Sequence, residues 1–226
     1  MSDSAALLAM LRHGDSAFPG GGASFSWGLE TLVQDGLVRD AAALERMIVE
    51  QLRLRWATSD RSAVLAAWDA DGDLDAVARI DRILETRALA RELREGSRRA
   101  GGALLTVHAR LGTNHAAEYQ VRIATDPTLG HLAAMQGLLW RQSEIGREQA
   151  ALMSGHAIAL AATGAAIRLG IIGHIDAQRI VGRAADAIGA LLATPATPIE
   201  AIHAFVPLVE IAAMRHETGE MRLFSN

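Results

Sequence analysis

Residues 146–169 read GREQAALMSGHAIALAATGAAIRL, and this stretch decides the fold class. Alanine and glycine dominate it, and Ala157, Ala161 and Ala165 recur every four residues. That spacing places the three side chains on one face of an α-helix. Because small side chains let two helix axes approach closely, we expect a buried helix at the centre of the molecule or at a tight dimer contact.

The rest of the chain follows the same periodicity. Apolar residues recur at spacings of three and four, and no segment keeps an alternation of period two. The predicted helices cover residues 5–13, 24–35, 40–56, 73–84, 87–111, 126–140, 146–169, 176–191 and the region from 197 onward. On the helix at 87–111, Leu89 and Leu111 are expected to face inward. We therefore predict an all-α fold, a single-domain helical bundle of about ten helices over residues 1–226.

Helix starts are predicted where a side chain can accept hydrogen bonds from the free amides of the first turn. These starts are Asp40, Asp73, Asp126 before Pro127, Asp176, and Thr197 with Pro198 and Glu200 as a capping box. Pro207 is expected to kink or split the last helix, because it lacks an amide hydrogen and clashes one turn back.

The composition excludes several kinds of chemistry. The 226 residues include no cysteine, so disulfides, thiolate metal sites and a cysteine nucleophile are excluded. The sequence also contains no lysine, which excludes a P-loop and a Schiff-base enzyme. A net charge of -4 and nine scattered aromatic residues argue against nucleic acid as a partner.

Membrane insertion is not expected either. The longest apolar run, residues 157–167, is too short to span a bilayer, and the first residues do not resemble a signal peptide. We expect a cytoplasmic protein without a membrane partner.

No catalytic, cofactor-binding or metal-ligating residue is predicted. No two of the eight histidines stand three or four residues apart, so no helix presents a chelating histidine pair. Glu200 and His203 form one Glu-x-x-His pair without a second copy, and Glu144 and Glu148 fit an exposed polar face. A metal site assembled from several helices stays open at this stage.

Four groups of segments carry a resemblance to a known family. They are SAFPGGG at 16–22 with SFSWGLE at 24–30, ELR at 92–94 followed by Ser97, Gly101, Leu104 and Leu105, AAIRLGIIGH at 165–174 with Gln178, and MRHE at 214–217 with RLFS at 222–225. Taken together, in this order over nearly the whole chain, they resemble the urease accessory protein F family. The chain departs from the family pattern at Gly20 and Ala23 and at residues 171–174, where the family usually has Pro-Leu-Gly-Gln.

The resemblance implies a non-enzymatic helper in urease maturation. It implies a homodimer that joins the D/H-type urease accessory protein and then a nickel-carrying GTPase, and a complex that inserts nickel into apo-urease. The chain would couple the nucleotide state of the GTPase to metal release and would have no cofactor of its own. Whether nickel passes along it in transit is left open.

The predicted functional residues fall into two groups. The predicted partner-binding residues are Glu30, Arg168, Arg215, His216, Glu217, Arg222, Leu223 and Phe224. The predicted structural turn residues are Pro19, Gly20, Gly21, Gly28 and Gly173. Near the C-terminus the charged side chains can form charge-assisted hydrogen bonds, and Leu223 and Phe224 are apolar anchors. The alternatives are a frayed chain end, an internal ion pair for Arg168 and nearby helix capping for Glu30.

Two other functions remain possible from the sequence. One is a metal-dependent helical hydrolase whose ligands, His131, His156 and Glu144, converge only in the fold. The other is a helical adaptor unrelated to urease.

Overall fold

The computed structural model describes residues 3–15, 17–20 and 25–216. Its α-helices are α1 (Asp3–Gly14), α2 (Leu29–Gln34), α3 (Ala41–Gln51), α4 (Arg61–Asp69), α5 (Leu74–Arg87), α6 (Arg91–Arg110), α7 (Ala116–Thr125), α8 (Leu132–Gln142), α9 (Arg147–Arg168), α10 (His174–Leu192) and α11 (Pro207–His216). A π-helix η2 (Leu52–Asp60) joins α3 to α4, and a 3-10 turn η3 (Ile199–Ala201) precedes α11. These described ranges contain no strand, so the all-α prediction is confirmed.

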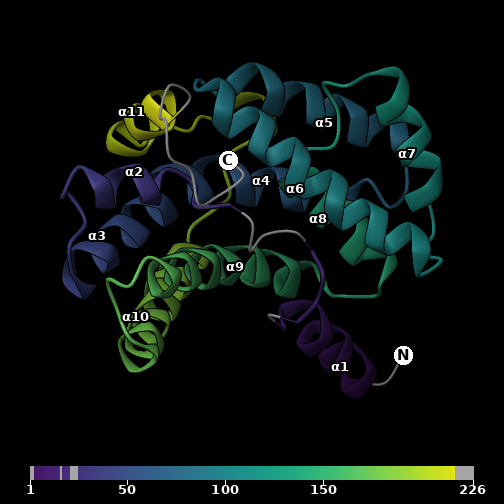
Figure 1. Ribbon diagram of the computed structural model, residues 1–226. Helices are drawn as coiled ribbons and strands as arrows, with labels where there is room; N and C mark the ends of the chain where they lie inside the picture. Colours follow the sequence, from purple (N-terminus) through teal and green to yellow (C-terminus); the bar gives the residue numbers. More distant parts are fainter. Residues whose placement is uncertain (1–2, 16, 21–24, 217–226) are drawn as a thin grey trace.

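Helix α9 connects two apolar clusters. In Figure 1 it crosses the lower middle of the view, with α10 at one end, α1 below the other, and α3, α4 and α8 above it. Its first half, through Ala150 and Met153, packs into the cluster built by α4 to α8. Its second half, including Ala159 and Ala166, packs into the cluster built by α2, α3, α10 and α11. The prediction of a central helix at 146–169 is therefore correct.

The buried face of α9 differs from the predicted one. Ala165 is buried, but Ala157 and Ala161 are only half-buried. Close approach depends instead on Gly155, where a Cβ atom would lie 2.9 Å from two ring atoms of Trp56. The Trp56 indole Nε1 donates a 2.9 Å hydrogen bond to Ser154 Oγ at the same crossing.

The predicted helix at 40–56 starts correctly but continues further. Asp40 caps it by accepting from the Ala43 amide at 2.8 Å. The chain then widens into η2 and continues as α4 to Asp69. The widened π-helical turn leaves carbonyl groups available, and the amides of His203 and Phe205 donate to the Thr58 and Leu54 carbonyls at 3.2 and 3.3 Å.

The predicted helix at 87–111 is wrong at its N-terminal end. Helix α5 ends at Arg87, and α6 begins only at Arg91. Leu89 and Leu111, expected inside, are 60% and 50% exposed. Ala90 has no side chain that could cap α6, and its amide instead donates to the Glu210 carboxylate at 3.2 Å. Because this capping carboxylate lies 120 residues away in the sequence, no local sequence pattern predicts the break between α5 and α6.

Several other predicted starts are also wrong. Asp126 ends the unpredicted helix α7 rather than starting α8, and Asp176 lies in the first turn of α10 after Gly173. Thr197 does not start a helix, since only the short turn η3 follows it. Pro207 starts α11 instead of kinking it, because the first helical position needs no amide hydrogen.

The turn before α2 corrects the predicted helix at 24–35. Trp27 and Gly28 have φ angles of 52° and 84°, in the left-handed region. A right-handed helix cannot pass through such residues, so α2 starts only at Leu29. Among the described residues, Trp27 is one of four non-glycine residues with a positive φ.

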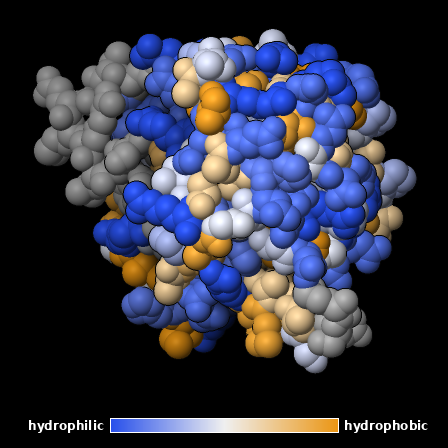
Figure 2. Space-filling view, turned by 90° about the vertical axis from the view of Figure 1, so that its right-hand side faces the viewer, coloured by the Kyte–Doolittle hydropathy of each residue, from blue (hydrophilic) through white to orange (hydrophobic). Residues whose placement is uncertain are grey.

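One described helix, α9, has the length and composition of a membrane span. Of its most apolar window, 56% is buried inside the molecule. Figure 2 shows a mostly hydrophilic surface on the side that carries α7, with its larger apolar spots near the lower edge. Helix α1 places Leu7, Leu8 and Leu11 at the surface.

A buried carboxylate fixes the start of α8. Asp81 is fully buried and accepts hydrogen bonds from the Tyr119 hydroxyl at 2.6 Å and from the Gly130 and His131 amides at 2.7 and 2.8 Å. Burial raises the pKa of Asp81 from 3.8 to about 6, although the three donors favour the ionised form. Asp81 thus replaces the local cap that the residues before Leu132 lack.

We predict that Asp81→Asn destabilises the protein most at acidic pH. A folded-state pKa above the unfolded value means that the contribution of Asp81 to stability is complete below pH ~4 and is lost as the pH rises through about 6. The gap in unfolding free energy between parent and variant should shrink by about 2 kcal/mol between pH 4 and pH 7. Urea denaturation at both pH values measures it.

The exposed Asp75→Asn change is the control and should show a smaller pH dependence. His131 and His108, whose pKa values burial lowers to about 4, lose their stabilising contribution as the pH falls, but both proteins share that effect. A gap that grows with pH would contradict the assignment.

Candidate functional site

A cluster of three buried charged or polar side chains lies where α2, α6 and α11 meet. His216 Nδ1 lies 2.5 Å from Glu92 Oε1, and its Nε2 lies 3.4 Å from Glu30 Oε2. Each of the three residues is at most 5% exposed. The cluster joins positions 186 and 124 residues apart in the chain.

The helices that carry these side chains favour their charges. Glu30 and Glu92 lie in the first turns of α2 and α6, and His216 is the last residue of α11. Helix dipoles stabilise carboxylates at helix N-termini and an imidazolium at a C-terminus.

The left-handed turn brings α11 close to α2. A Cβ atom on Gly28 would lie 3.2 Å from the Val209 carbonyl oxygen and 3.5 Å from the Ala212 side chain. Its φ of 84° is also one that glycine adopts without strain. Gly28 therefore permits the contact between α2 and α11 that brings Glu30 to His216.

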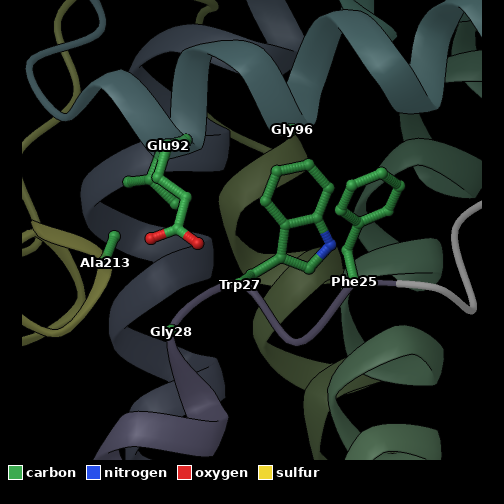
Figure 3. A pocket seen from close by; sticks show the side chains of 7 residues that line it. Phe25, Trp27, Gly28, Glu92, Gly96 and Ala213 are labelled. Atoms are coloured by element: carbon green, nitrogen blue, oxygen red, sulfur yellow. The ribbon is translucent and has the colours of Figure 1, made fainter. Parts of the chain in front are cut away.

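A narrow pocket opens beside the cluster. It is lined by Phe25, Trp27, Gly28, Glu92, Leu93, Gly96 and Ala213, and we call it the Trp27–Glu92 pocket. Figure 3 shows the Glu92 carboxylate between Ala213 and the Trp27 indole, with the Phe25 ring beyond the indole. The guanidinium of Arg55 lies 5.6 Å from the Trp27 ring centre, and that of Arg99 lies 5.7 Å from the Phe25 ring centre.

A second polar hollow lies on the other side of Leu93. It encloses about 30 Å³ and includes Arg55, Ser97, His131 and Glu210 in its wall. Burial raises the pKa of Glu210, against the opposing effects of Arg55 and the Ala90 amide. Glu210 and His216 thus hold the inner side of α11 against the first turn of α6.

The outer side of α11 has the opposite character. It exposes Leu208, Ile211 and Met214, and Phe205 is exposed just before the helix. Arg215 forms an ion pair with Asp35 across the gap to α2. Helix α11 is therefore anchored by buried polar contacts on one side and presents apolar side chains to solvent on the other.

The structure brings two of the predicted site residues together, Glu30 and His216, and buries both. Arg215 and Arg168 are exposed, the latter at the end of α9. Pro19 and Gly20 lie in an irregular segment, and Gly173 precedes α10 with a φ of -94°. Gly21, Glu217, Arg222, Leu223 and Phe224 lie outside the described residues. The assigned roles of all these residues stay predictions.

Sequence analysis missed Glu92, Glu210 and Trp27 as site residues. A pattern pointed to Glu92: Glu92, Gly96 and Ala100 are four residues apart on α6, and all three are buried. An acidic residue on such an inward stripe needs a buried partner. Nothing local pointed to Glu210, because its hydrogen-bond partner lies 120 residues away.

The ligand set proposed for a hydrolase does not converge. His131 contacts Glu85 at 3.0 Å and Ser97 at 3.2 Å, His156 is half-buried on α9, and Glu144 is exposed after α8. Within the part of the chain that the structure describes, no three histidine or carboxylate side chains form a group that could hold a metal ion.

We predict that His216→Ala destabilises the fold by about 3 kcal/mol, because it leaves the buried Glu92 carboxylate without the donor that faces it. Urea denaturation at pH 7 measures the change. The exposed His203→Ala is the matched control and should stay within about 0.5 kcal/mol of the parent. Equal effects of the two substitutions would show that the cluster does not hold α11 in place.

Comparison with known proteins gives consistent matches. The sequence model of the family described as UreF matches residues 38–185. A protein of Trichodesmium erythraeum named urease accessory protein UreF is 32% identical over 232 aligned residues, covering 100% of this chain and 99% of that protein. Urease accessory protein UreF 1 of Brucella melitensis is 32% identical over 97% of this chain and 92% of its own length. Urease accessory protein UreF of Yersinia enterocolitica is 28% identical over 97% of this chain and 98% of its own length.

Proposed function

This chain belongs to the UreF family of urease accessory proteins, and from that premise we propose that it acts as a non-catalytic scaffold in urease maturation. It bridges the D/H-type accessory protein and the nickel-carrying GTPase in the cytoplasm, as a homodimer. It regulates the insertion of nickel into apo-urease by that GTPase. Nickel is the cargo of the complex, and the scaffold holds no cofactor of its own.

The two-sided character of α11 is the observation that carries this proposal. Its inner side is fixed to α6 by Glu210 and His216, so the helix is a rigid support. Its outer side exposes Leu208, Ile211 and Met214 at roughly one-turn spacing, the pattern of a helix that docks into a groove. We assign this outer side to the D/H-type accessory protein, together with the C-terminal segment that follows His216.

The chemistry of the chain agrees with a scaffold. Without lysine the chain cannot form a P-loop, so a partner supplies the nucleotide site. Asp81 and His131, whose pKa values are shifted by burial, are both engaged in structural hydrogen bonds. Arg168, exposed at the end of α9, is assigned to the face that meets the GTPase.

We predict that Ile211→Glu lowers co-purification of the D/H-type accessory protein at least tenfold, because it places a charge in the centre of the apolar outer side of α11. The measurement is a pull-down with the two proteins co-expressed. Ile211 is 53% exposed, so the helical circular dichroism should not change.

Val121→Glu on α7 is the matched control, since Val121 is 67% exposed and lies on a different face. It should leave the pull-down unchanged. Retained binding by Ile211→Glu would remove α11 from the proposed interface.

We predict that Arg168→Ala lowers urease activation several-fold in cells that express the full maturation system, because it removes a charge-assisted hydrogen-bond donor from the face assigned to the GTPase. Urease activity in lysates measures the effect, with the thermal midpoint of the purified variant as the folding check. Arg110→Ala, at an exposed position on α6, should activate normally. Normal activation by Arg168→Ala would show that Arg168 has no part in the GTPase contact.

A further inference from the structure

We infer that the Trp27–Glu92 pocket is a binding site for the guanidinium group of an arginine side chain. This inference concerns a site between α6, α11 and the turn before α2, and it does not depend on the proposed scaffold role.

The first observation is an unpartnered carboxylate oxygen. Glu92 is 5% exposed, and its Oε1 is occupied by His216. Its Oε2 is shielded from solvent and has no hydrogen-bond partner among the described residues. Buried polar atoms are nearly always paired, and a bare carboxylate oxygen is among the most costly exceptions. We therefore expect Glu92 Oε2 to accept a hydrogen bond from a donor outside the described residues.

The second observation is where that carboxylate points. It faces the space between Ala213, Gly28 and the Trp27 indole, as Figure 3 shows. The Phe25 and Trp27 rings lie with centres 5.3 Å apart and planes 32° from parallel, so they form an aromatic wall next to it. A ligand in this pocket meets one anionic oxygen and one aromatic face.

A guanidinium fits this pair of features better than an ammonium. Its flat group stacks on an aromatic ring while its edge donates hydrogen bonds to a carboxylate. The two rings already attract such groups, since Arg55 and Arg99 lie within 6 Å of the Trp27 and Phe25 ring centres. An ammonium is more strongly hydrated and cannot stack in this way.

Entry requires the indole to move. The pocket is too narrow for a guanidinium beneath Trp27 in its present position. Trp27 belongs to the left-handed turn before α2, and a φ of 52° is strained for a residue with a side chain. The turn can therefore change its conformation without unwinding a helix. A ligand that enters the pocket must displace the Trp27 indole and so change the NMR signal of its N–H group.

The arginine has two possible sources. One is Arg222 of this chain, which follows His216 by six residues in the sequence. Six residues of extended chain can span about 20 Å. The other is an arginine on another protein. Both sources present the same chemistry to Glu92, and a titration distinguishes them.

The test follows the indole N–H signal of Trp27 by NMR in full-length chains, assigned with Trp27→Phe. N-acetyl-arginine amide is titrated into the parent and into Arg222→Gln. A saturable shift only in Arg222→Gln identifies Arg222 as the natural occupant, because the parent site is already filled. The same saturable shift in both chains identifies an arginine from elsewhere. Either result supports the site, and N-acetyl-lysine amide should bind at least tenfold more weakly.

Two further variants, made in the Arg222→Gln chain, test the pocket itself. Glu92→Gln should weaken binding at least tenfold, and Glu95→Gln, one turn apart on the same helix, should not. Gly96→Ala provides a variant that keeps the fold, because its Cβ would make ordinary contacts of 3.4 Å with Trp27 and 3.7 Å with Phe25 while narrowing the pocket. Its control is Gly102→Ala on α6, where a Cβ meets nothing within 4 Å.

The inference is overturned if no saturable Trp27 shift occurs in either the parent or Arg222→Gln. It is also overturned if binding persists unchanged in both Glu92→Gln and Gly96→Ala. None of these measurements uses urease or another accessory protein. A negative result would therefore overturn the arginine site without bearing on the scaffold role.

Discussion

The contact of α11 with the first turn of α6 is the constraint on which the candidate site depends. The Ala90 amide donates to Glu210, and His216 contacts Glu92, so two buried side chains of α11 meet the start of one helix. This contact fixes where α6 begins and holds the last described helix in place. It also brings α2 to the cluster, because Glu30 reaches the second nitrogen of the same imidazole. A hydrogen bond to a buried charged group is costly to break, so the three helices are held in one arrangement.

Caps supplied from distant parts of the chain recur in this fold. Asp81 accepts from the Gly130 and His131 amides and so caps α8, as Glu210 caps α6. In both cases the local sequence lacks a capping side chain, and a carboxylate on another helix replaces it. Separately from these caps, α9 contributes side chains to both apolar clusters. Buried hydrogen bonds thus fix the starts of α6 and α8, while the outer side of α11 stays apolar and exposed.

The candidate site could be predicted only in part. The resemblance pointed to Glu30 and His216 as partner-binding residues, and the structure adds that both are buried and face each other. Glu92 stood within a quoted motif without a role, and only the fold shows that it completes the cluster. Trp27 could not be predicted, because its importance comes from a left-handed backbone conformation and from the pocket that its indole closes.

The sequence by itself determined the features that depend on neighbours along the chain. Spacings of three and four give the all-α fold and the helix at 146–169, and Asp40 and Asp73 cap their helices through amides two or three residues ahead. Only the tertiary structure decided the break at residues 88–90, the start of α8 at Leu132 and the meeting of Glu30, Glu92 and His216. These features depend on hydrogen bonds between residues tens to nearly two hundred positions apart, and no local periodicity records which distant groups will meet.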